Sequence, residues 1–197
     1  MQVYGAVHSF ATSDLPRRGI IVTTSAAATA PAIIACLTPS TKLVMFESPS
    51  NPLTSCIDIR SVADAAHAVG ALVVVDNTFA SPILQKPLAL SADVVVQSAT
   101  KYLNGHSDVM AGVVCSSHAF IASLRAHQII HGATLSGRDA SLLERGLCTL
   151  ALRVRAQSSA AQALALFFSQ HHRVASVLYP GLETHPHHAV AGCCADA

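Results

Sequence analysis

Three short polar segments carry residue types that could take part in catalysis. Each begins where a short apolar run ends, at residues 47–52 (ESPSNP), 76–79 (DNTF) and 98–102 (SATKY). Side chains at the carboxyl ends of neighbouring parallel strands meet at one edge of the sheet, where α/β proteins bind their ligands. We therefore expect the three segments to form one site.

Lys101, Asp76, Ser98 and Thr100 could together hold an aldehyde cofactor. A free lysine amine can bind such a cofactor covalently, which is the starting point for electron-withdrawing chemistry on amino acids. Asp76 could keep a pyridine nitrogen protonated, and the two hydroxyls could donate to a phosphate. Taken singly, the aspartate would be a turn residue and the lysine a solvated charge. Their joint order along the chain favours the cofactor.

A long stretch around these residues resembles a known family nearly position for position. Residues 47–112 read ESPSNPLTSCIDIRSVADAAHAVGALVVVDNTFASPILQKPLALSADVVVQSATKYLNGHSDVMAG. They are similar to the Cys/Met metabolism family of pyridoxal-phosphate enzymes, which comprises cystathionine β- and γ-lyases, cystathionine γ-synthase and methionine γ-lyase. The similarity extends more weakly from Tyr4-Gly5 to the segment YPGLETHP at 179–186.

The resemblance implies a cofactor, pyridoxal 5′-phosphate, and a role for each candidate residue. Lys101 would bind the cofactor covalently and then move protons on the substrate's carbons. Asp76 would pair with the pyridine nitrogen, while Ser98 and Thr100 would contact the phosphate. The resemblance implies no metal.

Two further residues follow from the resemblance alone. Asn51 would hydrogen-bond the ring oxygen, and Tyr4 would stack on the ring and assist proton transfer at the leaving sulfur. Where the family usually has Tyr-Gly-Gly followed by Ser or Thr, this chain reads Tyr4-Gly5-Ala6-Val7. The local backbone at Tyr4 is therefore expected to differ.

Within the family, three phrases favour cystathionine β-lyase, a carbon–sulfur lyase of transsulfuration in methionine and cysteine metabolism. They are LPRRGIIV, DIRSVADAAHA and GHSDVMAGV, at 15–22, 58–68 and 105–113. Cystathionine γ-lyase and γ-synthase share most of these residues and stay as alternatives. A nucleotide-binding domain is disfavoured because the chain has no GxGxxG or GxxxxGKS/T.

Family members usually run to about twice this length, as two domains. By resemblance, the chain lacks the N-terminal arm that reaches a neighbouring subunit's site, the first part of the large domain and most of the small domain. The complete enzyme is expected to be a homo-oligomer, a homotetramer, acting on a small sulfur amino acid. The chain by itself is expected to be inactive and poorly soluble, so a catalytically silent cofactor-binding fragment stays as an alternative.

The elements that must position these residues follow from the apolar pattern. Four short valine-rich runs predict neighbouring strands buried on both faces of a parallel sheet, at 43–47, 71–76, 93–97 and 110–115. Residues 58–69 have helical periodicity, with Asp58 as N-cap and Gly70 as the stop. The predicted fold is α/β, a mostly parallel sheet sandwiched by helices. By the resemblance, it would be the incomplete large domain of a fold-type I pyridoxal-phosphate enzyme.

Other segments complete the prediction. Further helices are expected from Pro31 through Leu37, at 117–130 and over a long stretch at 139–169, with a strand at 173–179. Residues 1–138 would be the second half of the cofactor-binding domain. Residues 139–197 would be a connecting helix and the beginning of a small C-terminal α+β domain.

The composition limits the partners. The 197 residues are 51% hydrophobic and 12% charged with a formal net charge of +1, so no general field attracts nucleic acid or a membrane. No apolar run reaches the roughly 18 residues of a membrane span, and the start does not resemble a signal peptide. A soluble, cytoplasmic protein is expected.

Six cysteines are scattered without the spacing of a zinc site, and we expect them to be reduced and mostly buried. One cluster could in principle hold zinc, namely His185, His187, His188, Cys193 and Cys194. Its spacing fits no closed tetrahedral pattern, so a polar loop is the preferred interpretation.

Overall fold

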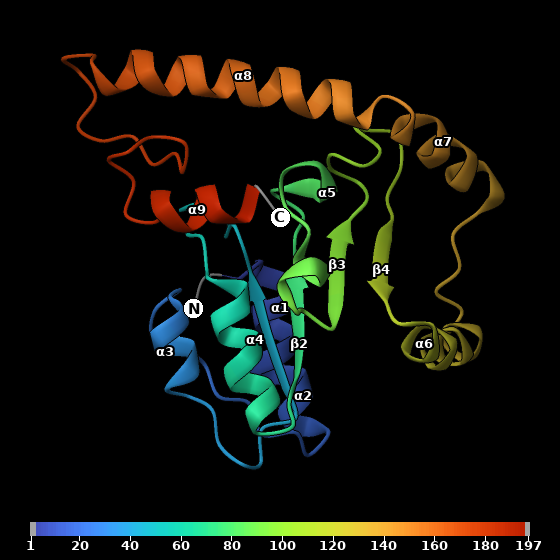
Figure 1. Ribbon diagram of the computed structural model, residues 1–197. Coiled ribbons are helices and arrows are strands. Elements are labelled where there is room, and N and C mark those ends of the chain that lie inside the picture. The colour runs from blue at the N-terminus through green and yellow to red at the C-terminus, as the bar shows by residue number, and fades with distance from the viewer. Residues whose placement is uncertain (1–2, 196–197) are drawn as a thin grey trace.

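The computed structural model describes residues 3–195 of the chain, with side chains through residue 192 (Figure 1). Its centre is a four-stranded sheet in the order β1-β2-β3-β4. The strands are β1 Leu43–Glu47, β2 Leu72–Asp76, β3 Val94–Ser98 and β4 Gly112–Ser116. All four predicted strands are thus present, and β1, β2 and β3 are parallel as expected.

The expectation that the fourth strand is also parallel is wrong, because β4 runs antiparallel to β3. The segment between them forms turns at the carboxyl end of β3 and makes no helical crossover, which a parallel connection requires. The Thr100 N–H donates to the Ala111 carbonyl at 3.3 Å, so the chain turns back directly.

Helix α4, Ile59–Ala68, covers one face of the sheet and confirms the predicted helix and its cap. The Asp58 carboxylate accepts from the Ser61 N–H at 3.1 Å, and Gly70, with φ +75°, follows the end of the helix. Burial of apolar surface between α4 and the sheet is the main stabilising contribution here. The helix contributes Ile59, Val62, Ala63 and Ala66 to this core, and the strands contribute Val44, Phe46, Val73 and Val75.

The prediction of strands buried on both faces is confirmed at Val74 of β2 and Val94 of β3, which are buried on the face opposite α4, and is wrong for most of β1 and the start of β2. Side chains alternate between faces along a strand. Leu43 and Met45 of β1 therefore lie opposite the α4 side, as does Leu72 of β2, which is the register partner of Leu43. These three side chains are 54%, 38% and 41% exposed.

The remaining helices are short except for those after β4. Before β1 lie α1 Gly5–Ser9, the π-helix η1 Phe10–Asp14, α2 Leu15–Arg17 and α3 Ala30–Ile34. Between β2 and β3 lie α5 Ser81–Leu84 and the 3₁₀ helix η2 Pro87–Leu90, and α9 His188–Ala195 is last. The helix expected from Pro31 through Leu37 thus ends earlier, at Ile34, where turn bonds replace it.

After β4, α6 His118–His131 confirms the helix predicted at 117–130, with Ser117 as its cap. The long helix predicted at 139–169 is instead two helices, α7 Gly137–Leu147 and α8 Leu150–Ser169. The break follows Gly146, whose carbonyl accepts from the Thr149 N–H in a tight turn and from the Arg153 guanidinium. In Figure 1, α8 runs across the end of the sheet toward which β3 points.

The strand predicted at 173–179 is wrong. No neighbouring strand lies beside this segment in the part of the chain that the structure describes, so its backbone has no ladder to join. Local turns replace it, such as the bond from the Val174 N–H to the His171 carbonyl at 3.0 Å. The division into two domains at residue 138 stays a prediction.

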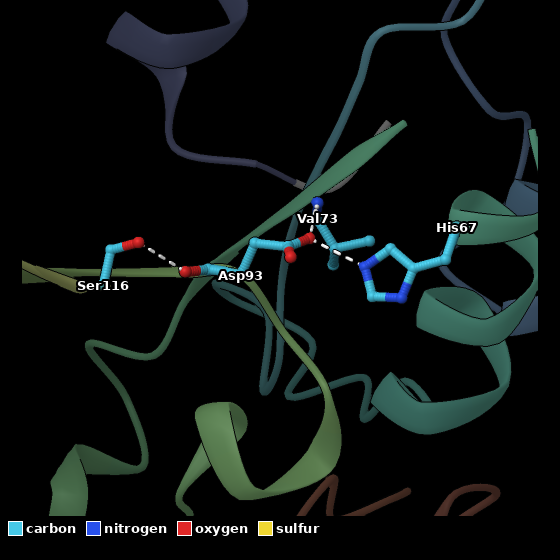
Figure 2. Close-up of polar contacts among 4 residues, drawn as sticks. All are labelled: His67, Val73, Asp93 and Ser116. Carbon is cyan, nitrogen blue, oxygen red and sulfur yellow. Dashed lines mark hydrogen bonds and ion pairs between the residues drawn. The ribbon is translucent and has the colours of Figure 1, made fainter. Parts of the chain in front are cut away.

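Polar contacts join four elements at the amino end of the parallel strands (Figure 2). The Asp93 carboxylate accepts from His67 Nε2 at 2.8 Å and from the Val73 N–H at 2.7 Å. The Ser116 hydroxyl donates to the Asp93 backbone carbonyl at 2.7 Å. This cluster connects α4, β2, β3 and β4 at the edge of the sheet opposite the predicted site.

Across residues 3–195, none of the helices combines the length and the apolar character needed to cross a bilayer. Of the cysteines with described side chains, Cys56 is buried and Cys36 is half-buried. Cys115 and Cys148 are exposed, so the expectation of mostly buried cysteines is wrong for these two.

Candidate functional site

The carboxyl ends of the three parallel strands bring the predicted polar segments together. Glu47 ends β1 and is the register partner of Asp76, which ends β2. Asp76 in turn pairs with Val96 of β3, two residues before Ser98. Because register partners and every second residue share a face, the side chains of Glu47, Asp76 and Ser98 lie on one face of the sheet.

Asp76 has a carboxylate oxygen to spare. Its Oδ1 accepts from the Thr78 N–H at 2.9 Å, a local turn bond. Its Oδ2 has no hydrogen-bond partner among the described residues, and the residue is half-buried. A carboxylate in this state can accept a proton-bearing nitrogen of a ligand.

Lys101 lies in the turn that follows β3. Its backbone N–H donates to the Ser98 carbonyl at 3.1 Å, and its own carbonyl accepts from the Gly105 N–H at 2.8 Å. The side chain is exposed and makes no hydrogen bond or ion pair with residues 3–195. The Ser98 hydroxyl is likewise uncommitted within this range, although its backbone N–H donates to the Thr78 hydroxyl at 2.8 Å.

The turn itself is firmly packed, although the lysine side chain is free. Ala99 and Leu103 flank Lys101 and belong to a small core with α7 and α8. From α8, Arg153 donates to the carbonyls of Tyr102 and Leu103 at 2.9 and 3.3 Å. The backbone that carries Lys101 is thereby fixed to the helix that crosses this end of the sheet.

Thr100 is already engaged in the fold. Its hydroxyl accepts from the Ala111 N–H at 3.0 Å and donates to the Ala111 carbonyl at 3.4 Å. The hydroxyl has one proton, so it can donate to a phosphate only by leaving this carbonyl. The predicted phosphate contact of Thr100 stays a prediction.

Tyr4 and Asn51 reach the same edge through a residue that the sequence analysis gave no role. The Glu47 carboxylate is buried, with Oε1 accepting from the Tyr4 N–H and Oε2 accepting from the Asn51 N–H at 3.2 Å. The side chains of Tyr4 and Asn51 are exposed. An acidic residue at the end of a predicted buried strand is the one sequence signal that could have drawn attention to Glu47, and it does not reveal the two backbone partners.

The electrostatics of Glu47 are unusual for an acid. Burial raises the pKa of its carboxyl, the Tyr4 and Asn51 N–H donors oppose that shift, and the charge of Asp76 adds to it. The negative charge of Asp76 therefore adds to burial in disfavouring ionisation of Glu47.

The opposite face of the sheet at the same end is closed. Asn77, next to Asp76, donates to the Gln85 side chain at 2.7 Å and accepts from Gln97 at 3.2 Å. All three residues are buried. Spare hydrogen-bonding capacity is therefore concentrated on the face of Asp76 and Ser98.

The histidines of the candidate zinc cluster lie in turns and at the start of α9. Among the described residues there is no group of three or more potential ligands, and the side chains of Cys193 and Cys194 lie outside them. His185 lies 3.5 Å from the Thr54 hydroxyl, and His187 accepts from the Cys56 N–H at 3.0 Å. Burial and then the neighbouring histidines lower the pKa of His185.

The donor set of this edge fits a phosphorylated pyridine aldehyde. An exposed amine, a carboxylate with a free oxygen and an uncommitted hydroxyl match an aldehyde, a ring nitrogen and a phosphate. The backbones of Tyr4 and Asn51 lie at the same edge, and the stacking role of Tyr4 and the hydrogen-bonding role of Asn51 stay predictions.

Comparison with known proteins identifies related chains. The family described as Cys/Met metabolism PLP-dependent enzyme matches residues 1–195. A cystathionine beta-lyase of Lactococcus lactis subsp. cremoris (strain MG1363) is 44% identical over 96% of this chain and 50% of its own. An L-methionine gamma-lyase of Pseudomonas putida is 42% identical over 96% of this chain and 48% of its own.

A solved structure agrees with these matches. The cystathionine gamma-lyase from Lactobacillus plantarum complexed with L-serine superimposes with a TM-score of 0.93 at 36% identity. The match covers 98% of this chain and 51% of that structure's chain. The chain thus spans about half the length of the curated relatives it matches.

Proposed function

Because the chain belongs to the Cys/Met metabolism family of PLP-dependent enzymes, we propose that it carries the cofactor-binding lysine of a carbon–sulfur lyase. The observation that carries the proposal is the set of three uncommitted groups on one edge of the sheet. These are the amine of Lys101, Oδ2 of Asp76 and the hydroxyl of Ser98.

Each of these groups has a distinct task. The Lys101 amine would hold the cofactor covalently and, as a free amine, would carry a proton between substrate carbons. Asp76 accepts a hydrogen bond from the protonated pyridine nitrogen through its free Oδ2. Ser98 donates to the phosphate, and Thr100 joins it when its hydroxyl leaves the Ala111 carbonyl. When bound, pyridoxal 5′-phosphate withdraws electrons from the carbon bonds of an amino acid.

Tyr4 and Asn51 contribute from the two segments that Glu47 holds. The Asn51 side-chain amide donates to the ring oxygen of the cofactor. Tyr4 stacks on the ring and carries a proton to the leaving sulfur. Both side chains are exposed, which leaves them free to contact a ligand.

The finer assignment is β-cleavage of cystathionine, which with water gives homocysteine, pyruvate and ammonia. A cystathionine beta-lyase at 44% identity supports it, as do the three phrases at 15–22, 58–68 and 105–113. The L-methionine gamma-lyase at 42% identity keeps γ-cleavage as the second candidate. Mainly pyruvate from cystathionine would support the first candidate, and mainly 2-oxobutyrate the second. The assay applies to a chain of the relatives' length.

For the 197 residues by themselves we propose cofactor attachment without turnover. The face of Asp76 carries the exposed apolar residues Leu43, Met45 and Leu72, and the chain spans about half of its relatives. An apolar face of this kind is normally covered by another part of the protein. Without that cover, association of the chains with one another is favoured and substrate is poorly positioned. Turnover like that of the longer relatives would contradict this proposal.

Borohydride reduction tests the attachment. The chain has three lysines, Lys42, Lys86 and Lys101, so each can be removed in turn. After incubation with pyridoxal 5′-phosphate and reduction, mass spectrometry should find the label on the peptide containing Lys101. Lys42→Ala and Lys86→Ala should keep the label, and Lys101→Ala should lose it. A label on Lys42 or Lys86 in the unmodified chain would overturn the assignment.

A further inference from the structure

Glu47 connects two segments that are far apart in the sequence. Its carboxylate accepts from the backbone N–H of Tyr4, 43 residues earlier, and from that of Asn51. It ends β1 level with Asp76 and shares its face of the sheet. The Glu47 side chain thus lies level with Asp76 and binds the backbones of Tyr4 and Asn51. We assign cofactor contacts to all three of these residues.

Both held segments are ordered around these bonds. Tyr4 precedes α1, and its carbonyl accepts from the His8 N–H at 3.0 Å, so Glu47 binds the beginning of a helical stretch. The loop of Asn51 is closed on itself by a bond from the Thr54 N–H to the Ser50 carbonyl at 2.9 Å. The exposed side chains of Tyr4 and Asn51 therefore depend on their backbones for position.

An ionised glutamate at position 47 lowers the stability of the folded state. The pKa of Glu47 is raised by burial, so above that pKa the folded state must hold a negative charge that it disfavours. Protonated Glu47 contributes to folding stability below the carboxyl's usual pKa of 4.5. This contribution is lost as pH rises through the pKa of Glu47 in the folded state. Perturbed acids of this kind concentrate at functional sites.

We propose that Glu47 is a positioning residue of the cofactor site, which holds the backbones of Tyr4 and Asn51 at fixed places beside Asp76. The proposal rests on the proposed function for its purpose and on the two hydrogen bonds for its geometry. Glu47 acts through these two residues and needs no contact with the cofactor.

Two variants and a control separate this role from a general contribution to folding. Glu47→Ala removes both acceptors, whereas Glu47→Gln keeps the volume and one acceptor oxygen. Glu144→Gln in α7 makes the same chemical change at an exposed glutamate. Hydrogen exchange by mass spectrometry would follow peptides covering Tyr4, Asn51 and, as a core reference, β2. Absorbance titration with pyridoxal 5′-phosphate would give the apparent Kd of each variant.

We expect a graded result. Glu47→Ala should speed exchange in both peptides by about tenfold or more, and Glu47→Gln in one of the two. The apparent Kd should rise about tenfold for Glu47→Ala and about threefold for Glu47→Gln. The β2 peptide and the Glu144→Gln variant should match the unmodified chain.

Several outcomes would overturn the inference. Unchanged exchange at Tyr4 and Asn51 would remove its geometric basis, whatever the cofactor does. Faster exchange with an unchanged Kd would show that Glu47 orders the segments without serving the cofactor. Faster exchange spread equally to the β2 peptide in both variants would mean a structural role only. If the unmodified chain fails to bind pyridoxal 5′-phosphate, the proposed function falls, and the exchange data still decide whether Glu47 holds the two backbones.

Discussion

Arg153 offers a direct test of how the turn carrying Lys101 is held. Its guanidinium donates to the carbonyls of Tyr102 at 2.9 Å, Leu103 at 3.3 Å and Gly146 at 2.8 Å. Its Nε also donates to the Thr149 hydroxyl at 3.0 Å. Replacing Arg153 by alanine would therefore leave three backbone carbonyls without this donor.

The magnitude follows from the number and the exposure of these bonds. Hydrogen bonds contribute about 0.5–1.5 kcal/mol each, and those to charged groups about 1.5–3 kcal/mol. Arg153 is half-buried, so water recovers part of the loss, and we expect Arg153→Ala to lower the free energy of unfolding by about 2–4 kcal/mol. The free energy of unfolding of Arg153→Lys should lie between those of Arg153→Ala and the unmodified chain, because the lysine ammonium cannot reproduce the planar, forked guanidinium.

Arg155 is the matched control, since it lies on the same helix, is exposed and makes no hydrogen bond or ion pair within residues 3–195. Urea unfolding followed by far-UV circular dichroism would give the free energies. Arg155→Ala should change stability by less than about 0.5 kcal/mol. If Arg153→Ala and Arg155→Ala agree within that margin, the four bonds do not hold the turn, and the reasoning fails.

Three further predictions address the ring contact, the pH dependence and the packing. Asp76→Asn should leave the fold nearly unchanged but raise the apparent Kd for pyridoxal 5′-phosphate about tenfold in an absorbance titration, and an unchanged Kd would contradict its role. Because burial and then neighbouring histidines lower the pKa of His185 below its usual 6.5, the unfolded chain binds the proton more readily. The urea midpoint should therefore fall as pH drops below about 6.5, and less so in His185→Gln. Gly146→Ala should cost about 1–3 kcal/mol in the same unfolding assay, because its Cβ would lie 2.4 Å from the Asn104 carbonyl oxygen. Gly137→Ala, with open space around it, should not destabilise.

The strands and the helix between them could be predicted because local signals sufficed. The valine-rich runs marked all four strands, and Asp58 and Gly70 marked the ends of α4 closely. The direction of β4 could not be predicted, since it depends on turn bonds between Thr100 and Ala111 that leave no pattern in the sequence. The segment at 173–179 failed for a related reason: strand propensity forms no strand without a neighbouring strand to pair with.

The candidate site, too, could be predicted from the sequence only in part. The types and order of Asp76, Ser98 and Lys101 predicted that they meet at one edge, and the register of β1, β2 and β3 confirms that the segments converge there. Glu47 and Arg153 act through backbone groups of other residues. Such contacts depend on the three-dimensional path of the chain, so residue types alone could not identify them.

The distribution of polar contacts explains why a ligand would bind on one face only. On the α4 side, Asn77, Gln85 and Gln97 bond to one another, so that face has little left to offer. On the other side, Asp76 and Lys101 keep unused groups at the carboxyl end of the strands. A cover over this end of the face would exclude water from the Asp76 carboxylate, and charge interactions strengthen as the effective dielectric constant falls. Whatever covers the half-buried Asp76 would therefore also strengthen its hold on a protonated ring nitrogen, so burial of this carboxylate and cofactor affinity should rise together.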